Sequence, residues 1–166
     1  MTLGLSISAF TQLHVIISLL GIISGAFVLL GLLRSQRLEG WTAVFLASNV
    51  LTSVTGFMFP FAGVTPAHVV GGIALAVLAA AILALYVYGL SGTWRPIYVA
   101  AAMLALYLNV FVGVAQAFQK LAFLQPLAPT QSEPPFVAAQ LAVLALFLWL
   151  GFLALKRFHP QAGMAA

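Results

Sequence analysis

Five long apolar stretches dominate this chain of 166 residues and limit the folds that it can adopt. A helix needs about 20 mainly apolar residues to cross a bilayer, because each residue adds about 1.5 Å to its length. The stretches do not alternate polar and apolar residues, as the strands of a membrane barrel do. The sequence therefore predicts an all-α polytopic membrane protein, a bundle of five transmembrane helices forming one domain over residues 1–166, with spans at about 10–33, 41–60, 67–88, 96–119 and 135–155.

The scarcity of charge excludes several classes of protein. Only 5% of the residues are charged, against about 25% in an ordinary soluble domain, so a soluble enzyme is excluded. The net charge of +4 comes from scattered cations that form no basic face, so no nucleic-acid partner is expected. The absence of cysteine excludes disulfide scaffolds and thiolate metal sites.

The cations predict the orientation in the membrane. The first apolar stretch has no charged segment before it and no clear cleavage site after it, so we expect a retained span. Of the six Lys and Arg residues, only Lys120 lies on the side of the N-terminus. Because cytoplasmic loops are enriched in cations, the N-terminus is expected outside and the C-terminus inside. The five cations on the inner side are Arg34, Arg37, Arg95, Lys156 and Arg157.

Polar residues within the spans gather towards the outer face. At about 1.5 Å per residue, His14 and His68 both lie about 30 Å from the cytoplasmic ends of their helices. Such residues are costly in hydrocarbon and are expected to face the interior of the bundle. The pattern predicts a polar cavity in the outer half and close apolar packing in the inner half. The candidate ligand-binding residues are His14, Asn49, Thr52, His68, Asn109, Gln116 and Lys120.

The matched depth of His14 and His68 leaves two interpretations open. Two neutral imidazoles from facing helices could bind one metal ion or the iron of a b-type haem, with Lys120 neutralising a propionate. Alternatively, each histidine is an interfacial residue that hydrogen-bonds to a backbone carbonyl.

The sequence carries no recognisable catalytic motif. Both acidic residues, Glu39 and Glu133, lie outside the predicted spans. Since ion-coupled carriers usually have an intramembrane carboxylate, secondary active transport is disfavoured. There is no metalloprotease motif and no phosphate-binding glycine loop, and no serine has an evident oriented base. We therefore expect a protein that is not an enzyme and has no catalytic residues.

Several segments resemble a group of small multi-pass membrane proteins of bacteria to which no activity is attributed. The segments are residues 107–120, 127–136, 55–61 and 65–68. The resemblance implies a location in the bacterial inner membrane and implies no chemistry.

Three functions fit these observations. The leading expectation is a non-catalytic subunit or assembly factor of a membrane complex, with another membrane protein or a second copy as its partner. The second is the binding of a lipophilic small molecule, such as a quinone or a lipid, in the polar cavity. The third is electron transfer through a haem or metal bound by His14 and His68.

Overall fold

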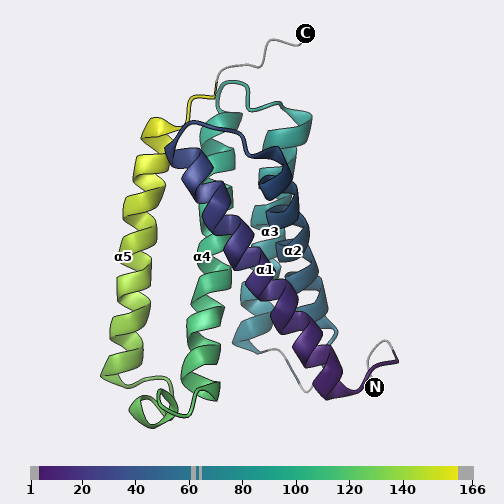
Figure 1. Ribbon diagram of the computed structural model, residues 1–166, viewed down its shortest axis with the longest axis vertical. Helices are drawn as coiled ribbons and strands as arrows, with labels where there is room; N and C mark the ends of the chain where they lie inside the picture. Colours follow the sequence, from purple (N-terminus) through teal and green to yellow (C-terminus); the bar gives the residue numbers. More distant parts are fainter. Residues whose placement is uncertain (1–3, 61–62, 64, 161–166) are drawn as a thin grey trace.

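A computed structural model describes residues 4–60, 63 and 65–160 of the chain, and every regular element in this part is a helix (Figure 1). Five long helices account for most of it. A short π-helix, η1, continues the third long helix, and a short 3₁₀-helix, η2, lies in the connection after the fourth. The helices are α1 (Ile7–Leu33), α2 (Glu39–Phe57), α3 (Pro66–Ile82), η1 (Leu83–Val87), α4 (Trp94–Lys120), η2 (Gln125–Leu127) and α5 (Pro134–Arg157).

Capping residues and prolines explain most of these boundaries. The Ser6 hydroxyl accepts a hydrogen bond of 3.2 Å from the amide of Ala9 and caps α1. Helices α3 and α5 both begin at a proline, the residue type favoured at the first helical position. The predicted second span extended to Pro60, but α2 ends at Phe57. The residue before a proline is biased away from helical geometry, so the helix ends ahead of Phe59.

The end of the third helix departs from regular α geometry. Over Leu83–Val87 the chain forms a π-helix, in which the amide of Tyr88 reaches back five residues to the carbonyl of Leu83. The apolar composition of this stretch gave no indication of the change. Single π-helical turns are rare and often occur at functional sites. The residues around η1 are therefore candidates for a functional site.

Successive helices run in opposite directions (Figure 1). The α1–α2 connection, the α3–α4 connection and the end of α5 share one end of the bundle, and the start of α1 and the α4–α5 connection share the other. We call the first the loop-one end and the second the opposite end. Helix α1 crosses the bundle obliquely and packs on α2, α4 and α5, whereas α3 packs between α2 and α4.

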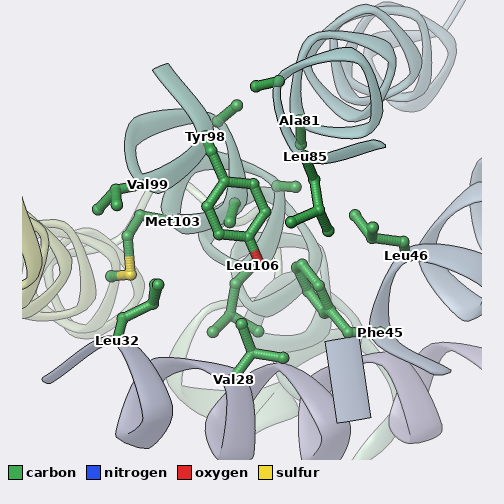
Figure 2. Packing of buried hydrophobic residues seen from close by; sticks show 14 of the residues in the cluster. Val28, Leu32, Phe45, Leu46, Ala81, Leu85, Tyr98, Val99, Met103 and Leu106 are labelled. Carbon is green, nitrogen blue, oxygen red and sulfur yellow. The ribbon is translucent and has the colours of Figure 1, made fainter. Parts of the chain in front are cut away.

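The apolar core occupies the half of the bundle near the loop-one end. It is built from the last turns of α1, the first half of α2, the end of α3 with η1, and the first half of α4. Figure 2 shows the Tyr98 ring near the centre of this cluster, with Leu85 and Phe45 to one side. The other labelled members are Val28, Leu32, Leu46, Ala81, Val99, Met103 and Leu106.

Four of the five long helices within the described part of the chain are long and apolar enough to cross a membrane. They are α1, α3 extended by η1, α4 and α5. The chain is thus an all-helical protein with the properties of a multi-pass membrane protein. Helix α2 falls outside this set because it begins with Glu39 and carries several polar side chains, among them Asn49.

Candidate functional site

Two of the predicted site residues form the centre of a polar contact between three helices. The side-chain amide of Asn109 on α4 donates a hydrogen bond of 3.0 Å to Asn49 Oδ1 on α2. The same nitrogen donates to the carbonyl oxygen of Ser18 on α1, at 3.2 Å. Asn49 in turn donates to the Phe45 carbonyl within its own helix, at 2.8 Å. The Asn49–Asn109 pair therefore joins α1, α2 and α4 near the middle of the bundle.

A glycine on α1 makes room for this pair. A Cβ atom at Gly21 would lie 2.8 Å from Asn109 Nδ2 and 2.9 Å from Asn49 Nδ2, closer than real Cβ contacts. Only glycine allows α1 to approach so closely, as small residues commonly do between membrane helices. The close fit leaves the pair little space for a ligand, so we interpret it as an interhelical contact.

His14 has a defined hydrogen-bonding role on α1. Its Nδ1 lies 2.8 Å from the hydroxyl oxygen of Thr55 on α2, and that oxygen also lies 2.7 Å from the Leu51 carbonyl oxygen. Either neutral tautomer of His14 can make this contact, because the Thr55 hydroxyl can donate its hydrogen to Nδ1 or to the Leu51 carbonyl. The His14 ring packs edge-on against Phe59, with centroids 5.3 Å apart.

His68 has a hydrogen-bonding role at the start of α3. The amide of Thr65 donates a hydrogen bond of 3.1 Å to His68 Nδ1, where a capping box more often places Glu or Gln. A neutral His68 consequently carries its hydrogen on Nε2. The ring also contacts Phe57 at the end of α2, with centroids 5.6 Å apart. Both histidines thus lie near the last turn of α2 but are oriented by different partners.

These roles do not favour a metal or haem held by both Nε2 atoms. Each iron or zinc ligand must present a nitrogen lone pair, which Nε2 of a neutral His68 does not while Nδ1 accepts from the Thr65 amide. No group of three or more His, Cys, Asp and Glu side chains that could hold a metal occurs in the described residues. His14 hydrogen-bonds to the Thr55 hydroxyl and His68 to the Thr65 amide, partners that differ from the carbonyl expected for an interfacial histidine.

The other predicted site residues have different surroundings in the described part of the chain. The Thr52 hydroxyl is buried without a hydrogen-bond partner in the described part of the chain. Gln116 and Lys120 are exposed on the last turns of α4. Of the residues proposed from sequence, the structure thus connects Asn49 with Asn109 by a hydrogen bond.

Two glutamines attach the α4–α5 connection and the start of α5 to α4. They were not among the site residues predicted from the sequence. Gln131 Nε2 donates to the Ala115 carbonyl at 2.7 Å, and Gln140 Nε2 donates to the Phe111 carbonyl at 3.1 Å. The two carbonyls lie four residues apart and so share one face of α4. These bonds fix the α4–α5 connection and the start of α5, so we assign them a structural role.

A pocket of about 510 Å³ lies at the loop-one end, where the sequence analysis predicted close apolar packing. This volume is within the range of small-molecule sites. Its walls come from the end of α1, the α1–α2 connection, the start of α2, η1, the start of α4 and the residue after α5. The lining residues are Val28, Leu32, Gln36, Arg37, Leu38, Glu39, Gly40, Thr42, Ala43, Leu85, Tyr86, Tyr98 and Phe158.

The pocket changes character from its mouth to its interior. Arg37 and Glu39 at the mouth are exposed, and neither side chain has a hydrogen bond or ion pair in the described part of the chain. Leu32 and Phe158 in the interior are buried, at 2% and 1% exposed. A molecule with a charged head and an apolar body would match this gradient.

Two hydroxyl groups also line the pocket. They belong to Thr42 and Tyr98, which are buried, at 6% and 3% exposed. Both hydroxyls can offer hydrogen bonds to the polar atoms of a bound molecule.

Backbone geometry holds the α1–α2 connection beside the pocket. Ser35 adopts a φ of 56°, the left-handed conformation that ends a helix. The amide of Gln36 then donates to the Gly31 carbonyl at 2.9 Å and that of Ser35 to the Leu32 carbonyl at 3.3 Å. This pair of bonds is a Schellman motif. It turns the chain so that Gln36 and Arg37 follow directly at the mouth of the pocket.

Comparison with protein-family models, curated proteins and solved structures finds no match to this chain.

Proposed function

We propose that all five long helices span the membrane, including α2. The buried residues of α2 include Thr42, Ser48, Asn49 and Thr55, so its polar side chains face the other helices. Its exposed large residues are mainly apolar, with Val44, Leu51, Val54 and Phe57 among them. At 19 residues it is about 28 Å long, close to the hydrocarbon thickness of about 30 Å. A low average hydropathy is therefore compatible with a span whose lipid-facing side is apolar.

The same proposal places the loop-one end in the cytoplasm of a bacterial inner-membrane protein. Every lysine and arginine except Lys120 belongs to segments at that end, as the positive-inside rule requires. Aromatic pairs support an interface at this level: Trp41 stacks on Phe27 at 4.2 Å, and Trp94 stacks on Tyr88 at 3.8 Å between centroids. Trp and Tyr are enriched where membranes meet water.

The function that the geometry supports best is the non-catalytic binding of an amphiphilic molecule from the cytoplasmic leaflet. The observation that carries this proposal is the pocket at the loop-one end, with its charged mouth and apolar interior. The pocket lies at the depth where lipid head groups meet acyl chains if the loop-one end is at the membrane surface. The binding of a lipophilic molecule was also expected from the sequence, but in the outer half of the bundle.

A pocket-filling substitution tests this function. Ala43 on α2 lines the pocket and is exposed, so Ala43→Trp should fill the space without disturbing the core. Ala47→Trp is a matched control, because Ala47 is exposed one turn further along α2 and does not line the pocket. Native mass spectrometry of protein extracted in mild detergent should detect a bound amphiphile in the wild type and in Ala47→Trp. Equal retention in Ala43→Trp would contradict the proposal.

A second candidate function, that of a subunit in a membrane complex, is favoured by α5. Within this helix only Gln140 and Ala154 are buried, and Leu148 and Trp149 are 67% and 60% exposed. Such a helix can associate with a helix of a partner protein or of a second copy. Cysteine crosslinking at Leu148 in native membranes, with Leu104 on α4 as a control, would detect a partner.

A further inference from the structure

The mouth of the pocket carries two opposite charges without hydrogen-bond or ion-pair partners among the described residues. Arg37 and Glu39 are two residues apart, both line the pocket, and both are exposed. No hydrogen bond or ion pair of either side chain occurs in the described part of the chain, so they do not neutralise each other directly. Both groups are therefore available to a ligand that carries charges of both signs.

We infer that the pocket selects a zwitterionic phospholipid whose head group carries a phosphate and a primary ammonium, as phosphatidylethanolamine does. This inference rests on the proposed amphiphile binding. The planar guanidinium of Arg37 can donate two parallel hydrogen bonds to a phosphate. The Glu39 carboxylate is acceptor-only and suits the N–H donors of a primary ammonium.

The remaining lining residues fit the less polar parts of the same molecule. The Thr42 and Tyr98 hydroxyls also line the pocket and can donate to ester oxygens of the glycerol region. Leu32 and Leu85, which are buried, offer apolar walls to an acyl chain. The pocket thus presents charged, hydroxyl and apolar groups, the three kinds of surface that a phospholipid carries.

Other amphiphiles leave at least one of the two charged side chains, Arg37 or Glu39, without a matching group. An anionic phospholipid such as phosphatidylglycerol would bring a phosphate to Arg37 but no cation to Glu39. Phosphatidylcholine has a quaternary ammonium without N–H donors, so it cannot hydrogen-bond to the Glu39 carboxylate. A quinone carries no charge and would use neither group.

Competition between lipids tests the inference. The protein is placed in nanodiscs with equal amounts of phosphatidylethanolamine, phosphatidylcholine and phosphatidylglycerol, then extracted, and the retained lipid is identified by mass spectrometry. We expect phosphatidylethanolamine to be enriched. Arg37→Gln should lower the retention of all three phospholipids by about two- to fivefold, the range for one solvent-exposed ionic contact. Glu39→Gln should remove only the preference for phosphatidylethanolamine.

Two control variants separate the pocket from general charge effects. Arg34→Gln alters the same connection at a residue that does not line the pocket, and Glu133→Gln removes the only other acidic residue. Both should retain the wild-type preference. Phosphatidylglycerol retained as strongly as phosphatidylethanolamine, or a preference that survives Glu39→Gln, would overturn the inference.

The lipid-retention experiments distinguish failure of this inference from failure of the proposed function. If Ala43→Trp releases the retained lipid and no lipid is preferred, the pocket binds amphiphiles without the selectivity inferred here. If Ala43→Trp and Ala47→Trp retain lipid equally, the pocket is not the binding site, and both the function and the inference fail.

Discussion

The backbone amide of His159 donates a hydrogen bond of 2.7 Å to the Ser35 hydroxyl, joining residues 124 positions apart in the sequence. Ser35 lies in the connection after α1, and His159 lies after α5. The bond thus holds the chain after α5 against the α1–α2 connection. Phe158, the residue before His159, is 1% exposed and lines the pocket. One hydrogen bond therefore positions part of the pocket wall.

Removing the Ser35 hydroxyl should weaken the attachment of the segment after α5, which forms part of the pocket wall. We expect Ser35→Ala to lower the protection of the His159 amide against hydrogen exchange by about two- to tenfold, since a net hydrogen bond contributes about 0.5–1.5 kcal/mol. Hydrogen-exchange mass spectrometry of the peptide that contains Phe158 measures the change. Ser91→Ala is the control, because its hydroxyl donates only to the Tyr88 carbonyl in the α3–α4 connection. Unchanged protection in Ser35→Ala would show that the bond does not hold this segment.

Adding one methyl group at Gly21 should destabilise the bundle. The new Cβ would lie within 3.0 Å of both asparagine amides, so we expect Gly21→Ala to lower the free energy of unfolding by about 1–3 kcal/mol. Gly72→Ala on α3 is the control, because a Cβ there meets no heavy atom within 4 Å. Unfolding in mixed detergent micelles with increasing dodecyl sulfate provides the measurement. Equal stability of the two variants would contradict the close packing around Gly21.

The Asn49–Asn109 hydrogen bond should give a measurable coupling energy. A double-mutant cycle with Asn49→Ala and Asn109→Ala isolates the pair from their other contacts. Hydrogen bonds between membrane helices contribute about 0.6 kcal/mol on average. We expect a coupling of about this size in the same unfolding assay. Additive losses from the two substitutions would show that the pair contributes no interaction of its own.

The connection before α5 should depend on pH through Glu133. Desolvation raises the pKa of its carboxyl, but hydrogen bonds from Thr130 and Ser132 outweigh this effect, so the pKa lies below its ordinary value of 4.5. A lowered pKa in the folded state means that the carboxylate stabilises the turn above the unfolded pKa. This contribution is lost as the pH falls through the folded value. The amide resonance of Thr130 should shift in this acidic window, and Glu133→Gln should abolish the shift.

The helices were predictable because their signals are local. Long apolar stretches, together with Pro66 and Pro134 at helix starts, specify where α3 and α5 begin. The end of α2 was misplaced because apolar residues continue to Phe59, whereas the proline that follows stops the helix earlier. The π-helix was not predictable, since its residues are as apolar as those of the preceding turns.

The candidate site was less predictable because it depends on how distant segments meet. The polar stripes correctly indicated that Asn49 and Asn109 face other helices, but not that Gly21 packs directly on them. The pocket combines the α1–α2 connection with Tyr98 on α4 and Phe158 after α5. Arg37 and Glu39 were read from sequence as loop charges, and no periodicity within one helix links them to Tyr98.

An experimental structure of the protein in nanodiscs prepared from native lipids tests the central claim most directly. The account predicts an ordered amphiphile in the pocket at the loop-one end, with its head group beside Arg37 and Glu39 and its apolar part against Leu32 and Leu85. The Ala43→Trp variant, examined in the same way, should lack it. An ordered molecule in the outer half of the bundle, with a collapsed or empty pocket beside Phe158, would contradict the account.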